Sequence, residues 1–226
     1  LFEDKVQDKK VLMERAKDAE VLVLANMPLE GEVIKSDDKL KMISVAFTGI
    51  DHVDTMACTE KNVMVCNAAG YSTSSVAELT YGLIFSVLRN IMPLDKATRE
   101  GKTRNGFSQN EILGKTIGIV GTGAIGMRVG QISKAFGCNV LAYSRSEKKE
   151  AIDAGFKYVS LDELLSKSDI VSLHVPLNDK TKGLISKEKI ELMKSSAILI
   201  NTARGPVVDN NALAEALKKG EIKGAG

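Results

Sequence analysis

An arginine lies just past a strongly apolar run near the end of the sequence. The run 197–200 (AILI) predicts a buried strand, and Arg204 follows it in a short polar segment that continues into Gly205 and Pro206. A guanidinium is costly to bury alone, but its planar donors suit a carboxylate or a carbonyl oxygen. Arg204 is therefore predicted to bind an anionic ligand. A structural ion pair or a helix cap is the alternative interpretation.

Three glycines, Gly121, Gly123 and Gly126, have G-x-G-x-x-G spacing between an apolar run and a helical pattern. In this context the first glycine allows a tight turn, the second lets the backbone approach a pyrophosphate, and the third lets the helix pack closely on the strand. The N–H groups of Ala124 and Ile125 would then face the phosphates at the helix N-terminus. The segment predicts a dinucleotide site, and a structural turn without a ligand is the alternative.

The end of the next predicted strand carries no carboxylate. About 20 residues after the glycines, an acid would hold the ribose 2′-hydroxyl of NAD. The sequence has Ser144, Arg145 and Ser146 there instead. A guanidinium and two hydroxyls can hold a 2′-phosphate, which a carboxylate would repel. NADP is therefore the favoured cofactor, and NAD is the alternative, with Arg145 stacked on adenine or facing water.

Composition excludes several classes of protein. Of the 226 residues, 44% are hydrophobic and 27% are charged, which suits one large core or two modest ones. The net charge of +2 gives no basic field for nucleic acid. No apolar run reaches membrane-spanning length, and no signal peptide or metal site is expected. The three cysteines have no CxxC spacing, which favours a reducing, cytoplasmic compartment.

Short apolar runs alternate with helical patterns along the chain. The runs lie at 21–25, 42–47, 63–66, 116–121, 139–144, 170–175 and 197–202. The helical patterns cover 5–19, 74–91, 125–136, 147–154, 161–167, 187–193 and 211–219. Continuous apolar runs are typical of parallel strands covered on both faces, and the alternation favours a doubly wound α/β fold. Ser160 and Glu163 predict a capping box at the start of one helix.

A small, polar stretch at 67–75 predicts a domain boundary. Residues 1–70 would form one domain, and residues 71–226 would form a second domain that holds the glycine loop. The helical pattern at 74–91 is apolar nearly all round, which predicts packing between the domains or against a second subunit.

These motifs together resemble the D-isomer-specific 2-hydroxyacid dehydrogenase family over nearly the whole chain. The similar segments stand in the family's order: FTGIDHVD (47–54), NAAGYSTSSVAELT (67–80), GKTIGIVGTGAIG (114–126), SDIVSLHVPLNDKTKGLI (168–185) and LINTARGPVVDNNAL (199–213). The resemblance implies a flavodoxin-like substrate domain interrupted by a Rossmann domain. It also implies a homodimeric oxidoreductase that uses NAD(P) to interconvert a small 2-oxo acid and its D-2-hydroxy acid.

The resemblance also implies roles for individual residues. Arg204 would bind the carboxylate and the 2-oxo oxygen of the substrate and polarise the carbonyl for hydride attack. The backbone would turn at Gly49, so that the N–H groups of Gly49 and Ile50 point at the same carboxylate. Asp51 and Asp54, beside them, would cap or bond the local backbone. The residues implied near the nicotinamide or its ribose are Val175, Pro176, Thr181, Thr202 and Ala203.

Neither histidine matches the position of the family's catalytic histidine. His52 is expected at the surface or between domains, and His174 is expected to pack beside the cofactor. By the resemblance, the catalytic histidine and its glutamate partner follow the segment EIKGAG, at which the sequence stops. The chain is therefore expected to be a fragment that is inactive alone. Leu1 begins inside a helical pattern, so a preceding start is expected as well.

Several functions remain open. The leading hypothesis is a reductase of a small acid such as glyoxylate or hydroxypyruvate. Phosphoglycerate dehydrogenase is an alternative, but Lys39 and Lys41 lie at the wrong end of the strand that leads to the substrate loop. Two further hypotheses are a cofactor-sensing regulatory protein on the same fold and a different nucleotide-dependent Rossmann enzyme, such as a homocysteine-forming hydrolase. The presence of Arg204 and of the loop 47–54 favours the dehydrogenase.

Overall fold

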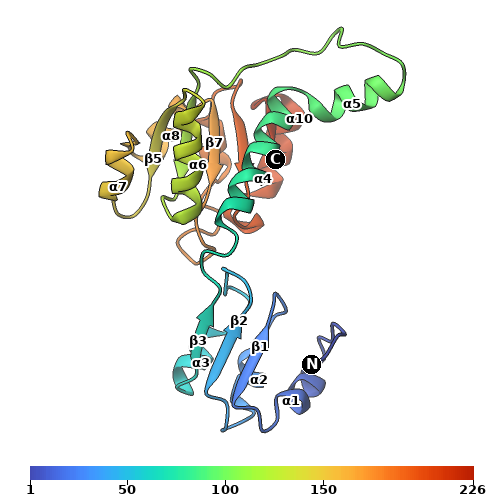
Figure 1. Cartoon of the computed structure of the whole chain (residues 1–226), viewed down its shortest axis with the longest axis vertical. Coiled ribbons are helices and arrows are strands. Elements are labelled where there is room, and N and C mark those ends of the chain that lie inside the picture. Colours follow the sequence, from blue (N-terminus) through green and yellow to red (C-terminus); the bar gives the residue numbers. More distant parts are fainter. The chain divides into compact units, whose positions relative to one another are not determined.

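The computed structural model describes all 226 residues, which form two compact units (Figure 1). Unit 1 comprises Leu1–Ser72 and unit 2 comprises Thr73–Gly226. The boundary expected near residue 70 lies beside this division. No helix in either unit has the length and apolar character needed to cross a bilayer.

Unit 1 contains a three-stranded parallel sheet. Its elements are α1 (Lys9–Ala16), β1 (Val21–Leu24), α2 (Gly31–Lys35), β2 (Met42–Val45), α3 (Thr55–Glu60) and β3 (Met64–Asn67). The strands pair in the order β1-β2-β3, and Met42 lies between Val21 and Met64 in the register. The core of the unit packs Ile43 of β2 with Ile34 of α2.

Within unit 1 only one face of these apolar strands is covered. Ile43 and Val45 are buried, whereas Val21, Val23 and Met64 are exposed. Successive side chains of a strand point to opposite faces, and the helices α2 and α3 contribute their buried residues to the cluster around Ile43. The apolar runs are continuous in sequence, but only one face of the sheet is packed within the unit.

Unit 2 is a six-stranded parallel sheet with helices. Its elements are α4 (Thr73–Leu88), α5 (Ile91–Arg99), β4 (Thr116–Val120), α6 (Ala124–Ala135), β5 (Asn139–Tyr143), α7 (Lys149–Asp153), β6 (Lys157–Tyr158), α8 (Leu161–Lys167), β7 (Ile170–Leu173), α9 (Lys187–Glu191), β8 (Ile198–Asn201), the short 3₁₀ helix η1 (Gly205–Val207), α10 (Asn210–Lys219) and β9 (Gly224–Ala225). The strand order is β6-β5-β4-β7-β8-β9. This order confirms the doubly wound fold. After β4 the chain first extends the sheet on one side, with β5 and β6, and then on the other side, from β7 to β9.

Two hydrophobic clusters cover the sheet of unit 2. One contains Ile119 of β4 with Tyr81 and Ile84 of α4, and the other contains Leu173 of β7 with Leu164 of α8. The helices α4 and α6 lie together over one face (Figure 1). The Tyr81 hydroxyl donates to the carbonyl oxygen of Val129 on α6 over 2.8 Å.

The helical pattern at 74–91 corresponds to α4, and only its last residue belongs to the next helix, α5. Helix α4 ends at Leu88, because Asn90 takes a left-handed backbone with φ of 52° before α5 begins. Its buried residues belong to unit 2's own core, whereas Leu79 on the same helix is 56% exposed, so packing against another domain or subunit stays a prediction. The sequence analysis missed α5, α2 and α3, and α2 and α3 have only 5 and 6 residues. The segment of α5 and the following loop forms an arm on unit 2 (Figure 1).

Candidate nucleotide and substrate site

The first and third glycines of the loop after β4 are required by the packing of the protein itself. Gly121 has φ of +100°, and a Cβ there would lie 2.6 Å from the carbonyl oxygen of His174. A Cβ on Gly126 would lie 2.0 Å from the carbonyl oxygen of Gly121. The turn and the close approach of α6 to β4 therefore both exclude a larger residue.

Gly123 has no such requirement. Its φ is −69°, and no atom lies within 4 Å of an ideal Cβ. It precedes α6 without a side-chain cap, and the N–H groups of Ala124 and Ile125 donate to no acceptor of the chain. This open space over the N-terminus of a 12-residue helix fits a pyrophosphate, so the residues present fit a dinucleotide cofactor.

The turn after β5 carries side chains without partners. Ser144 is half-buried, and Arg145 and Ser146 are exposed. None of the three side chains forms a hydrogen bond or an ion pair with another group of the chain. The turn lies beside the glycine loop, because β5 pairs with β4 and Gly121 donates its N–H to the carbonyl oxygen of Tyr143 over 2.8 Å. A guanidinium and two hydroxyls are thus available where a ribose would extend from the pyrophosphate.

His174 follows β7, and its ring forms one short side-chain contact. Its Nε2 lies 2.9 Å from Oγ of Ser172, and desolvation of the ring lowers the pKa of His174 to about 4. The ring is therefore neutral at pH 7, which disfavours it as a general acid there. The contact with the glycine turn agrees with the expected role of packing beside the cofactor site.

The loop after His174 is closed by its own hydrogen bonds. Val175 is half-buried and Pro176 is exposed. The hydroxyl of Thr181 donates to the carbonyl oxygen of Pro176 over 2.5 Å and accepts from the N–H of Asn178 over 2.9 Å. Thr181 thus fixes the shape of the loop that presents Val175 and Pro176 at the sheet edge.

Arg204 is positioned by the turn after β8. The side chain of Asn201 accepts from the N–H of Ala203 over 3.1 Å and donates to the carbonyl oxygen of Arg204 over 2.9 Å. Arg204 is half-buried, and its Nη1 donates to the carbonyl oxygen of Ala203 over 2.9 Å. Because β7 and β8 are neighbours, with Leu173 opposite Asn201, this turn lies beside His174.

The residues expected to bind the substrate carboxylate in unit 1 lie in the loop 46–54. Gly49 has no positive φ, so a left-handed backbone is not the reason for a glycine there. The loop is closed instead by bonds from the Val53 N–H to Ile50 and from the Leu29 N–H to His52, over 3.0 and 2.8 Å. Asp54 caps α3 by accepting from the Ala57 N–H over 3.0 Å, which confirms its expected local role. His52 is half-buried, and its Nε2 is buried without a hydrogen bond.

Comparison with known families decides the class of this protein. The sequence profile of the D-isomer specific 2-hydroxyacid dehydrogenase NAD-binding domain matches residues 81–226. The chain belongs to the D-isomer specific 2-hydroxyacid dehydrogenase family. Membership confirms the resemblance carried by the five sequence motifs.

Individual relatives show the range of the family. The chain is 42% identical to a D-3-phosphoglycerate dehydrogenase of Methanocaldococcus jannaschii over 96% of its length, but it spans only 42% of that protein. It is 38% identical to a glyoxylate reductase of Korarchaeum cryptofilum, covering 96% of this chain and 68% of that protein. A solved acyclic imino acid reductase in complex with NADPH and D-Arg superposes with a TM-score of 0.90 and 33% identity, over 97% of this chain and 71% of that one.

The sequence analysis missed three residues that position this family's motifs in the chain. Asn201 shapes the Arg204 turn, and a short polar side chain at a strand end is a known signal for such local bonding. Thr80 of α4 lies with its Oγ1 3.1 Å from that of Thr202, and a threonine within an apolar helical pattern was the one local signal. Tyr158 contacts the glycine loop through Thr122, and nothing local in the sequence indicates this contact.

Proposed function

We propose that this chain carries the cofactor site and the substrate arginine of an NAD(P)-dependent oxidoreductase that interconverts a small 2-oxo acid and its D-2-hydroxy acid. The observation that carries the proposal is the placement of Arg204 beside the His174 end of β7, on the same sheet edge as the open glycine loop. In open α/β sheets, ligands bind at this edge near the point where strand order reverses.

The proposed chemistry divides between the cofactor and the chain. A bound nicotinamide supplies or accepts a hydride. Arg204 binds the substrate carboxylate and the 2-oxo oxygen, and its positive charge stabilises the negative charge that develops on that oxygen. The lowered pKa of His174 disfavours it as the proton donor.

The test is substitution of Arg204 in the natural protein. Arg204→Ala should lower kcat/KM with glyoxylate or hydroxypyruvate by about 100-fold or more, while the Kd for the cofactor stays nearly constant. Arg204→Lys keeps the charge but loses the planar fork, so it should recover only part of the loss. An alanine variant with unchanged kcat/KM would remove Arg204 from the mechanism.

A small, unphosphorylated substrate is the proposed class. Lys39 and Lys41 precede β2, and each is paired with a carboxylate, Asp18 and Glu20, over 2.6 Å. The identity with a phosphoglycerate dehydrogenase keeps 3-phosphohydroxypyruvate as the second candidate. A panel of 2-oxo acids should give higher kcat/KM for glyoxylate or hydroxypyruvate than for the phosphorylated acid. The reverse order would favour the second candidate.

NADPH is the proposed preferred cofactor. The support is the turn of Ser144, Arg145 and Ser146, whose side chains have no partners in the chain. The double change Ser144→Asp with Arg145→Ala should shift the NADPH-to-NADH ratio of kcat/KM toward NADH by about tenfold or more. A natural protein that prefers NADH, with a ratio unmoved by the double change, would contradict the proposal.

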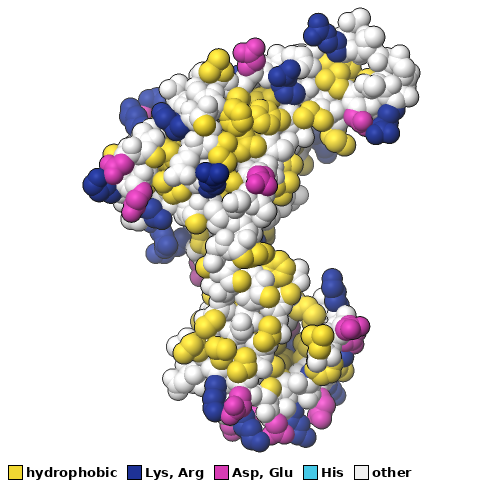
Figure 2. Space-filling view, in the orientation of Figure 1, with side chains coloured by type: hydrophobic (Ala, Val, Ile, Leu, Met, Phe, Trp, Pro, Cys, Tyr) yellow, Lys and Arg dark blue, Asp and Glu magenta, His cyan; other side chains and the backbone are white.

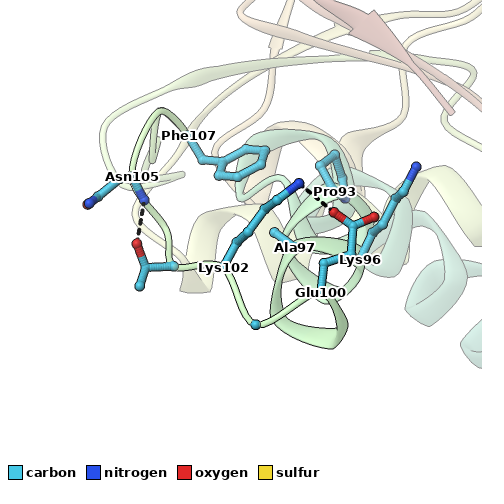
Figure 3. A pocket seen from close by; sticks show the side chains of 9 residues that line it. Pro93, Lys96, Ala97, Glu100, Lys102, Asn105 and Phe107 are labelled. Atoms are coloured by element: carbon cyan, nitrogen blue, oxygen red, sulfur yellow. Dashed lines mark hydrogen bonds and ion pairs between the residues drawn. The ribbon is translucent and has the colours of Figure 1, made fainter.

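We propose that the arm of unit 2 forms part of a homodimer interface. Ile91 and Met92 of α5 are 45% and 69% exposed, and hydrophobic side chains are visible over this part of unit 2 (Figure 2). The arm also borders an open hollow of about 600 Å³, in which Pro93 and Ala97 of α5 face Phe107 of the returning loop (Figure 3). Exposed apolar surface of this kind is typical of contact sites.

The dimer proposal can be tested by light scattering. Ile91→Lys should lower the apparent mass toward that of a monomer. Ile152→Lys, which changes an isoleucine of α7 with 50% exposure, should leave the mass unchanged. A monomeric wild type, or equal behaviour of the two variants, would contradict an interface at the arm.

A cytoplasmic location is proposed on the state of the cysteines. All three thiols are free, and Cys58 and Cys138 are buried. Burial raises the pKa of both buried thiols, which makes them inert as nucleophiles. Fractionation of the cells that make the protein tests the location.

A further inference from the structure

One tyrosine hydroxyl ties the glycine loop to the turn after β5. Tyr158 ends β6, and its hydroxyl donates to Oγ1 of Thr122 over 2.8 Å. The same oxygen accepts from the backbone N–H of Lys148 over 3.2 Å. Thr122 stands between Gly121 and Gly123 and is buried, whereas Lys148 directly precedes α7. A single hydroxyl therefore connects the segment proposed to face the pyrophosphate with the segment proposed to face the ribose.

The turn 144–147 is held at its two ends and not between them. At its start, the Gly121 N–H donates to the carbonyl oxygen of Tyr143 over 2.8 Å. At its end, the Lys148 N–H is bound by Tyr158. The hydroxyls of Ser144 and Ser146 and the guanidinium of Arg145 have no partner that would fix them individually. Their distance from the glycine loop is therefore set by these two anchors.

We propose that Tyr158 is a positioning residue for the ribose end of the cofactor: its hydroxyl holds the turn 144–147 where Arg145 and the two serines reach a 2′-phosphate. This inference rests on the proposed dinucleotide function of the sheet edge. A turn that is ordered before binding loses less conformational entropy when the ligand arrives. Only a ligand that contacts the turn gains affinity from this order. NADPH contacts the turn through its 2′-phosphate and therefore depends on the Tyr158 anchor more than NADH does.

Tyr158→Phe removes the hydroxyl while keeping the ring, which packs against the core of unit 2. In the 226-residue chain, this change should raise the Kd for NADPH about tenfold and the Kd for NADH no more than about twofold. Tyr81→Phe is the matched control, because it removes a hydroxyl bonded to Val129 and Ser133 elsewhere in the unit. It should lower the melting temperature without changing the ratio of the two Kd values. Equal weakening of both cofactors by Tyr158→Phe, or no change in either, overturns the proposal.

Hydrogen exchange separates this proposal from the proposed cofactor preference. In the chain without ligand, Tyr158→Phe should accelerate exchange of the Lys148 amide, and Tyr81→Phe should not. An unchanged rate at Lys148 overturns the anchor whichever cofactor the protein prefers. If the wild type binds NADH more tightly but exchange at Lys148 accelerates, the NADP preference fails and the anchoring role is supported.

Discussion

The two parallel sheets of this protein differ in how completely they are covered. In unit 2, every residue of β7 and four of the five residues of β4 are buried. In unit 1, no residue of β1 is buried, and Val23 and Met64 are 74% and 63% exposed. Both sheets are built from equally apolar runs, so the difference comes from the layers around the strands.

Because of this difference, a substitution in a strand has different consequences in the two units. A parallel sheet is stabilised by packing on both faces, and unit 2 supplies two hydrophobic clusters from its own helices. Its sheet edge is therefore a rigid support for the glycine loop and Arg204. Unit 1 packs one face around Ile43, so the substitutions that matter there lie on that face.

The largest expected effect is in the centre of unit 2. Ile119→Ala in β4 should lower the free energy of unfolding by roughly 2–5 kcal/mol, because Ile119 is fully buried and a cavity would remain. Chemical denaturation followed by circular dichroism measures the loss. Ile43→Ala on the packed face of unit 1 is the matched substitution and should also be destabilising. A loss below about 1 kcal/mol for Ile119→Ala would contradict the conclusion that the sheet of unit 2 is tightly packed on both faces.

Acid should destabilise unit 2 through His174. Desolvation lowers the pKa of His174 to about 4, so the unfolded chain, with an ordinary histidine pKa near 6.5, binds the proton first. The stability that depends on a neutral His174 is fully present above about pH 6.5. As the pH falls toward 4, the free energy of unfolding drops by about 3 kcal/mol in total. His174→Gln should lack this loss. The test is to measure the melting temperatures of the wild type and of His174→Gln between pH 7 and 4. An equal fall of both melting temperatures with pH would contradict the prediction.

Helix caps should contribute equally in the two units, because they act locally. Asp54 in unit 1 accepts from the Ala57 N–H, and Ser160 in unit 2 accepts from the Glu163 N–H over 3.2 Å. Asp54→Ala and Ser160→Ala should each lower the free energy of unfolding by about 1 kcal/mol. Denaturation midpoints with matched slopes test this. A clear difference between the two losses would show that the units respond differently even to local changes.

The smallest expected effect is on the exposed face of unit 1. Val23→Thr should change the free energy of unfolding by less than about 0.5 kcal/mol, because the side chain packs against little within its unit. The same denaturation experiment measures it. A loss above about 1 kcal/mol would show that this face is covered in solution, and the contrast between the two sheets would then disappear.

Local sequence was sufficient for the features that depend on neighbouring residues. The glycine turn, the helix that follows it and the Ser160 cap were predicted, because each is decided by backbone conformation within a few residues. The capping box is only half formed, however. The Glu163 carboxylate binds Lys167 over 2.7 Å, and a cation one turn away on the same helix was an equally good partner.

Only the tertiary structure decided the features that depend on distant groups. The exposed face of β1, the lowered pKa of His174 and the absence of a left-handed turn at Gly49 could not be read from the adjacent residues. The bonds from Thr80 to Thr202 and from Tyr158 to Thr122 join segments that meet only when the sheet is assembled. The sequence by itself determined the family, the strand–helix alternation and the place of Arg204 after a strand. Burial, desolvation and long-range hydrogen bonds were left to the fold, because each is a property of what surrounds a residue in space.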